Sequence, residues 1–135
     1  MKRALIDAIV VTAIAAGAVM AAFWHGRAEA HTYGANLVTA HTGGGYRWDT
    51  PGLYVRRDDG LTLGALRNSL GRTSIHASQT WERGPWAVQA GVISGYPMAP
   101  VVPLLTGSVL IGNQRLILIP GPRNRMALHY ALEWK

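Results

Sequence analysis

The sequence predicts an all-β protein, a small eight-stranded antiparallel up-and-down β-barrel behind an N-terminal signal peptide. Turn signals rich in glycine, proline, asparagine and aspartate recur at short, regular spacing after residue 30. Between these signals, no stretch of ten or more residues shows helical periodicity. Short strands joined by such turns form a meander, and closing the meander into a barrel removes its exposed edges.

The N-terminal segment has the pattern of an export signal. Lys2 and Arg3 precede an apolar run over residues 4–22, and small residues follow it. We expect residues 1–21 to be the signal peptide, with cleavage after Ala21 or as late as Ala30. A retained membrane anchor is the alternative, because an apolar run of 19 residues can span a bilayer. Residues 31–135 then form a single barrel domain.

Turn signals divide the mature chain into its expected strands. The signals lie at residues 43–45, 58–60, 71, 83–85, 95–97, 112–113 and 121–124, and each ends one strand. The expected strands, in chain order, are residues 32–42, 50–57, 61–69, 72–82, 86–94, 101–111, 114–120 and 125–134.

The last of these strands indicates how side chains are sorted between the two faces of the barrel. Large apolar residues occupy every second position from Met126 to Trp134, and small or polar residues occupy the positions between them, from Ala127 to Glu133. A membrane barrel, with its apolar face outward, has this alternation. A soluble lipocalin-like barrel with an apolar interior would show the same period and is the alternative.

Aromatic residues and prolines add two further expectations. Most tryptophans and tyrosines fall near predicted strand ends, as in the aromatic girdle of a membrane barrel. Pro100, Pro103 and Pro120 lie in or beside strands, where proline cannot donate to a ladder. A closed barrel that contains them should therefore have local gaps in its hydrogen bonding.

Charge and composition limit the partners and the chemistry. The net charge of +6, from 13 basic and 7 acidic residues, is scattered along the chain without the clustered footprint of a nucleic-acid-binding protein. An anionic membrane surface is a suitable partner for such a charge. The chain has no cysteine, so it can form no disulfide and no thiolate metal site.

Three segments resemble the lipid A palmitoyltransferase family. Residues 60–82, GLTLGALRNSLGRTSIHASQTWE, resemble its segment in which a Lys-Asp-Ser motif ends one strand and a Gly-Trp-Glu-like stretch closes the next. Residues 90–121, AGVISGYPMAPVVPLLTGSVLIGNQRLILIPG, have the same succession of an Ala-Gly-Val strand, a loop, Pro-x-x-Pro-Leu-Leu and Ile-Pro-Gly. The final MALHYALEW is similar to the family's closing strand, so the resemblance covers roughly residues 41–134. The chain also resembles short barrel proteins of phages and prophages, in which Pro-Gly-Leu-Tyr-Val and Arg-Asn-Ser-x-Gly-Arg-Thr-Ser recur.

The resemblance implies an outer-membrane barrel with an interior hydrocarbon pocket. It also implies transfer of a palmitoyl-type acyl chain from a phospholipid to lipid A, without a cofactor or a metal. The expected partners are membrane lipids and not nucleic acid, and the barrel is expected to act as a monomer.

Carried over residue by residue, the resemblance names the candidate catalytic residues. Ser69 matches the family's serine, and Asn68 stands where the family has an aspartate. We assign the family's histidine to His41, at the end of the first expected strand; His25 and His31 are the alternatives. His41 would act as a general base for Ser69 or for the acceptor hydroxyl, since imidazole titrates near neutrality.

Two arginines close to Asn68 and Ser69 in the sequence are candidate substrate-binding residues. Arg67 and Arg72 would bind phosphate or stabilise an oxyanion. The alternative is a polar hydrogen-bonded cluster at the barrel mouth with no catalytic role. It is favoured by Asn68, because an amide can neither accept a proton nor carry a negative charge. His76 and His129 alternate with apolar residues and are expected to face the interior as hydrogen-bonded polar groups.

Overall fold

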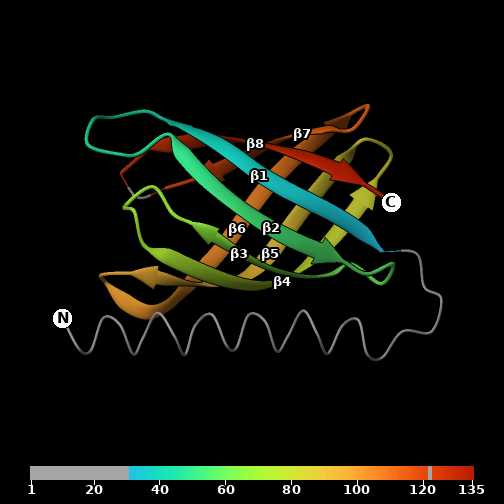
Figure 1. The fold of residues 1–135 in the computed structure, drawn as a ribbon, viewed down its shortest axis with the longest axis horizontal. Helices are drawn as coiled ribbons and strands as arrows, with labels where there is room; N and C mark the ends of the chain where they lie inside the picture. Colours follow the sequence, from blue (N-terminus) through green and yellow to red (C-terminus); the bar gives the residue numbers. More distant parts are fainter. Residues whose placement is uncertain (1–30, 122) are drawn as a thin grey trace.

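The computed structural model describes residues 31–121 and 123–135, which form a closed antiparallel β-barrel (Figure 1). Each strand pairs with the next, and the last pairs with the first, so the predicted fold class is confirmed. No predicted strand boundary is wrong by more than two residues. The strands are β1 (Thr32–His41), β2 (Asp49–Arg56), β3 (Leu61–Arg67), β4 (Thr73–Arg83), β5 (Trp86–Tyr96), β6 (Ala99–Ile111), β7 (Gln114–Pro120) and β8 (Met126–Trp134).

The barrel has two different ends. Residues 57–60, 84–85 and 112–113 form short connections at the end where β1 begins and β8 ends, which we call the turn end. Residues 42–48, 68–72, 97–98 and 121–125 connect the strands at the opposite end, which we call the loop end. The described residues contain no helix long and apolar enough to span a membrane. The predicted signal peptide and its cleavage sites, and the alternative histidine His25, lie outside the described residues.

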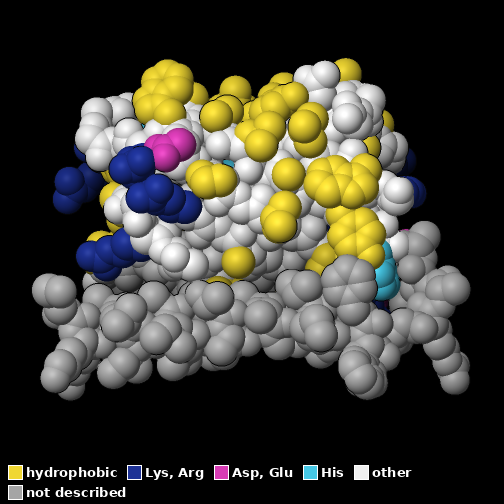
Figure 2. Space-filling model, viewed as in Figure 1, with side chains coloured by type: hydrophobic (Ala, Val, Ile, Leu, Met, Phe, Trp, Pro, Cys, Tyr) yellow, Lys and Arg dark blue, Asp and Glu magenta, His cyan; other side chains and the backbone are white. Residues whose placement is uncertain are grey.

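Side chains alternate between the lumen and the outer face, as the period of a β-strand requires. In β8, the residues predicted to point inward, including His129, Ala131 and Glu133, are buried, whereas Leu128 and Trp134 on the other face are about half exposed. Apolar side chains gather over the outer face of the barrel (Figure 2). Most of the buried polar residues, such as Thr62, Ser74 and Ser78, alternate with outward-facing residues of their strands. The barrel is therefore polar inside and apolar outside.

Glycines in the wall make room for the large side chains of the lumen. Tyr54 pairs with Gly34 on one side and with Gly64 on the other. A Cβ atom at Gly34 would fall on the Tyr54 ring, and one at Gly64 would meet His76 and Tyr54. The aromatic ring thus lies directly over the bare backbone of the neighbouring strand, which only glycine permits.

The wall is interrupted where the prolines predicted a gap. The ladder between β6 and β7 runs from the turn end to the pair Gly107–Leu118 and, within the described residues, goes no further. The loop half of β6, residues 99–106, pairs with β5 only, and the β5–β6 ladder itself skips the Gly95–Pro100 position. This half of β6 contains Pro100 and Pro103, and β7 ends at Pro120. The expected local loss of pairing is confirmed.

Exposed tryptophans mark both ends of the barrel. Trp81, Trp86 and Trp134 are all at least half exposed, and each lies near the turn end of its strand. Trp48 is exposed at the loop end, just before β2. This distribution fits the predicted girdle for these four tryptophans; Trp24 lies outside the described residues.

Candidate functional site

The lumen holds a cavity of about 140 Å³ with two different sides. His41, His76 and His129 line it from β1, β4 and β8. Aliphatic side chains line it from the part of the wall next to the ladder interruption; they include Leu104 from β6 and Ile117 and Ile119 from β7. A cavity of this size resembles engineered protein cavities that accept a benzene-sized molecule. This cavity is smaller than a palmitoyl-type chain.

His41 and Ser69 both line this cavity near the loop end. His41 is the last residue of β1, and its ring stacks on Tyr46, with centroids 4.6 Å apart. Arg125 donates to the Tyr46 hydroxyl at 3.1 Å and so holds the stacked ring in place. The Nε2 atom of His41 is buried and has no hydrogen-bond partner among the described residues. The structure thus brings His41 and Ser69 to one cavity, without a hydrogen bond from Nε2 to the serine.

Asn68 is held by its surroundings in one orientation. Its amide nitrogen donates to Ser74 Oγ at 2.9 Å and to the Gly95 carbonyl at 3.0 Å. Its amide oxygen accepts from the backbone N–H groups of Leu70 and Arg72, both at 3.0 Å. An asparagine side chain offers two donors and two acceptor lone pairs, so all of its hydrogen-bonding capacity is used. An aspartate could not make the two donated bonds, and this explains why an amide suits this position.

The two candidate substrate-binding arginines do not line the cavity. Arg67 is exposed, with a guanidinium nitrogen 3.9 Å from a carboxylate oxygen of Asp49. Arg72 is exposed as well, and its backbone N–H is the group that Asn68 binds. Alternation explains the position of Arg67, which comes directly before the inward Asn68 and so faces outward. Basic side chains gather at one side of Figure 2, at the end where Figure 1 shows the connection between β1 and β2.

One ion pair at the loop end is bidentate. Arg47 donates from Nε and from a terminal nitrogen to the two carboxylate oxygens of Asp49, at 3.0 and 2.8 Å. This hydrogen bonding raises the pKa of Arg47. The Arg47 backbone N–H also donates to the Ser69 carbonyl at 2.9 Å, which ties the β1–β2 connection to the β3–β4 connection.

His76 and His129 face the lumen, as predicted, but of the two only His129 forms a side-chain hydrogen bond within the described residues. Nδ1 of His129 lies 2.5 Å from the Thr39 hydroxyl, which in turn lies 2.7 Å from the Thr50 hydroxyl. Nδ1 of His76 is buried with no partner among the described residues, contrary to the expectation that this histidine is hydrogen-bonded. The described residues contain no group of three or more histidine, aspartate or glutamate side chains placed to hold a metal ion.

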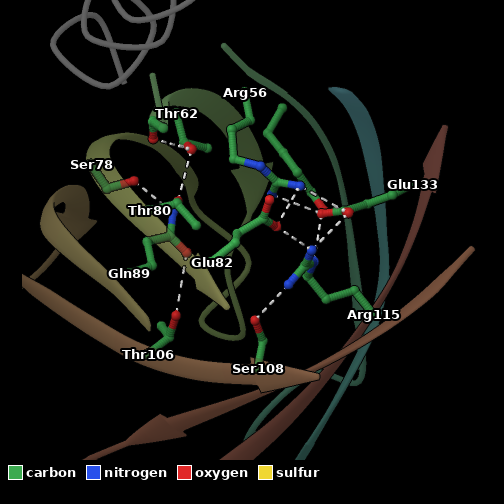
Figure 3. A network of polar contacts seen from close by, with 12 residues as sticks. Arg56, Thr62, Ser78, Thr80, Glu82, Gln89, Thr106, Ser108, Arg115 and Glu133 are labelled. Atoms are coloured by element: carbon green, nitrogen blue, oxygen red, sulfur yellow. Dashed lines mark hydrogen bonds and ion pairs between the residues drawn. The ribbon is translucent and has the colours of Figure 1, made fainter. Parts of the chain in front are cut away.

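A buried ion-pair cluster lies inside the barrel toward the turn end (Figure 3). Glu133 of β8 accepts hydrogen bonds from Arg56 at 3.0 Å to each oxygen and from Arg115 at 2.6 and 3.0 Å. The Tyr54 hydroxyl donates to Glu133 as well. Glu82, about half exposed, forms a second acceptor for both arginines, at 2.7 and 3.1 Å. Two positive and two negative charges therefore neutralise one another inside the barrel.

Hydroxyl and amide groups extend this polar lining from the ion-pair cluster along the lumen. The Thr62 and Thr80 hydroxyls lie 2.9 Å apart, and Gln89 donates to Ser78 at 2.6 Å. Thr106 donates to the other end of the Gln89 amide at 3.3 Å, so the adjacent strands β4, β5 and β6 are linked along the inner face of the wall (Figure 3).

The ion-pair cluster corrects one expectation from the sequence. The pair Arg56-Arg57 before two aspartates predicts a solvated hairpin end. Arg57 fits this, with a side chain 2.8 Å from Asp59 and about half exposed, but Arg56 is 6% exposed and lies inside the barrel. The sequence does contain a signal for the inward position of Arg56, because this residue alternates with outward residues of its strand. A charge at an inward position needs a counterion.

A scan against protein-family models finds no match for this chain, and a search of curated proteins finds no similar sequence. The fold is therefore established by the structure itself, as a closed eight-stranded antiparallel barrel.

Proposed function

We propose that this protein is an outer-membrane β-barrel that binds membrane lipid and does not itself catalyse a reaction. The observation that carries the proposal is the sorting of side chains: the outer face exposes Leu105, Leu118, Leu128 and other large apolar residues, while most of the buried residues are polar or charged. A bilayer is the solvent that stabilises this arrangement, because the closed ladder leaves few unpaired backbone groups facing lipid. A soluble lipocalin-like barrel would need the opposite sorting.

The ion-pair cluster and the structural role of Asn68 support a barrel without catalysis. The cluster of Arg56, Arg115, Glu82 and Glu133 pairs the charges inside the lumen with one another. The residue that stands in place of the family's aspartate is fully used in hydrogen bonds of the wall.

Fractionation of cells that express the full chain tests this proposal. We expect the protein in the outer-membrane fraction, and we expect it to migrate differently on a detergent gel before and after boiling, as folded membrane barrels do. Recovery from the soluble periplasmic fraction would contradict the proposal and would favour the soluble alternative.

Acyl transfer is a second candidate, and a specific observation favours it. The backbone pairing between β6 and β7 stops at Gly107–Leu118 within the described residues, next to the aliphatic side of the cavity that His41 and Ser69 line. An acyl chain could enter from the bilayer at this place, with its carbonyl group near Ser69. His41 would then act as the base, since its Nε2 atom has no partner among the described residues. A palmitoyl-type chain would require the cavity to widen.

Mass spectrometry of lipid A separates the two candidates. Lipid A from cells that express the wild type is compared with lipid A from cells that express Ser69→Ala at equal outer-membrane level. A gain of one acyl chain in the wild type, lost in Ser69→Ala, would support acyl transfer from phospholipid to lipid A. Unchanged lipid A in both strains is the result that the non-catalytic barrel predicts.

A further inference from the structure

The outer face of the barrel carries an apolar groove. It has a volume of about 560 Å³, within the range of roughly 300–1,000 Å³ that is usual for small-molecule sites. Its floor and sides come from β4 to β8, and almost all of its lining is apolar. It therefore differs from the cavity of His41 and Ser69 in position and in chemistry.

The register of the strands explains how the groove forms. Trp81, Val88, Gly107, Leu118 and Leu128 pair in succession and make one row across five strands. All but Gly107 are large, outward and about half exposed. A Cβ atom at Gly107 would meet no atom within 4 Å, so the glycine leaves a hollow in the middle of an otherwise bulky apolar row.

The neighbouring row places a charge at one end of the hollow. Arg83, Trp86, Val109 and Leu116 pair in succession, two residues closer to the turn end. Trp86 is 65% exposed and lines the groove together with Trp81. Arg83 is exposed, lines the same groove, and has no ion-pair partner within the described part of the chain. An apolar hollow thus ends at an unpaired guanidinium beside two tryptophans.

We propose that this groove binds one anionic phospholipid, with an acyl chain over Gly107 and the phosphate on Arg83. This proposal rests on the proposed outer-membrane location. Tryptophan is enriched at the headgroup level of a bilayer, and arginine binds phosphate through a planar set of donors. Short turns mark the periplasmic end of outer-membrane barrels, so the groove faces the inner, phospholipid leaflet. Charge complementarity with Arg83 selects a headgroup that carries no positive charge of its own.

Native mass spectrometry of the full chain in detergent tests the site. Phosphatidylglycerol is titrated as the anionic probe and phosphatidylcholine as the zwitterionic one. We expect one bound phosphatidylglycerol, held about fivefold more tightly than phosphatidylcholine, since a basic residue near a membrane contributes about 1 kcal/mol toward anionic lipid. Arg83→Gln should remove the difference between the two lipids, and Gly107→Trp, which fills the hollow, should weaken both.

Two variants provide matched controls. Lys135→Gln removes a positive charge at the same end of the barrel, and Ala77→Trp adds a tryptophan on the outer face away from the groove. Both should bind the two lipids as the wild type does. Equal affinity for both lipids in the wild type, unchanged binding in Gly107→Trp, or a protein dimer in place of the lipid complex would overturn the site. If the wild type still shows outer-membrane fractionation and heat-modifiable migration, only the site fails and the proposed function stands.

Discussion

Replacement of Asn68 should destabilise the barrel, because the side chain makes four hydrogen bonds and is almost completely buried. A typical hydrogen bond contributes about 1 kcal/mol to the free energy of unfolding, and a buried partner left unpaired costs about 1–3 kcal/mol. Asn68→Ala removes all four bonds and leaves their partners unpaired, including Ser74, which is fully buried. We expect a loss of about 3–4 kcal/mol.

Asn68→Asp is the more informative change, since it restores the residue that the resemblance implies. A carboxylate keeps the two accepted bonds from Leu70 and Arg72 but loses the two donated bonds. It also places a negative charge beside the Gly95 carbonyl oxygen. We expect this variant to lose about 2 kcal/mol of the free energy of unfolding at neutral pH.

Equilibrium unfolding in urea, followed by tryptophan fluorescence in lipid vesicles, measures these differences from the transition midpoint. Ser69→Ala is the matched control, because within the described residues the Ser69 hydroxyl has no hydrogen bond, and its change should stay within about 1 kcal/mol. The reasoning is refuted if Asn68→Asp is as stable as the wild type. If Asn68→Asp instead led to acylation of lipid A in expressing cells, the wall would tolerate an aspartate at this position and the barrel could act on lipid A.

Two further changes test the packing of the lumen. Glu133→Gln should lower the free energy of unfolding in urea by about 3–5 kcal/mol, because it leaves two buried arginines without their main counterion. Glu82→Gln, at the half-exposed carboxylate, should lower it by about 1 kcal/mol or less. Equal effects of the two variants would contradict the role given to the ion-pair cluster. Gly34→Ala should lower the free energy of unfolding by about 1–3 kcal/mol, because the new methyl group falls on the Tyr54 ring. Gly107→Ala, whose methyl group points into open space, should be neutral or slightly stabilising. A Gly34→Ala variant as stable as the wild type would show that the Tyr54 ring is free to move.

The strands could be predicted from the sequence because their signals are local. Glycine-rich turns and the two-residue period of the last strand depend only on neighbours in the chain, and these signals place β8 correctly, with Glu133 inside. The prolines of β6 and β7 likewise predict the interruption of the wall, since a missing backbone N–H is a property of the residue itself.

The contacts inside the lumen could not be predicted, because they depend on how distant strands come into register. Arg56 and Glu133 are 77 residues apart and meet only because β1 pairs with both β2 and β8. The catalytic and substrate-binding roles of the candidate site stay predictions. His41 and Ser69 do share a cavity, but the outward direction of Arg67 follows only once the inward position of Asn68 is known.

The central claim is that the outer face of the barrel meets lipid and its lumen does not. Because the chain contains no cysteine, single cysteines can be introduced and spin-labelled at adjacent residues of opposite direction: Leu128 and Ala127 in β8, and Leu105 and Thr106 in β6. In vesicles, we predict that labels at Leu128→Cys and Leu105→Cys collide readily with oxygen and rarely with a water-soluble nickel chelate, and that labels at Ala127→Cys and Thr106→Cys collide rarely with oxygen. Equal access of the nickel chelate to Leu128→Cys and to a loop label at Thr42→Cys would contradict the account.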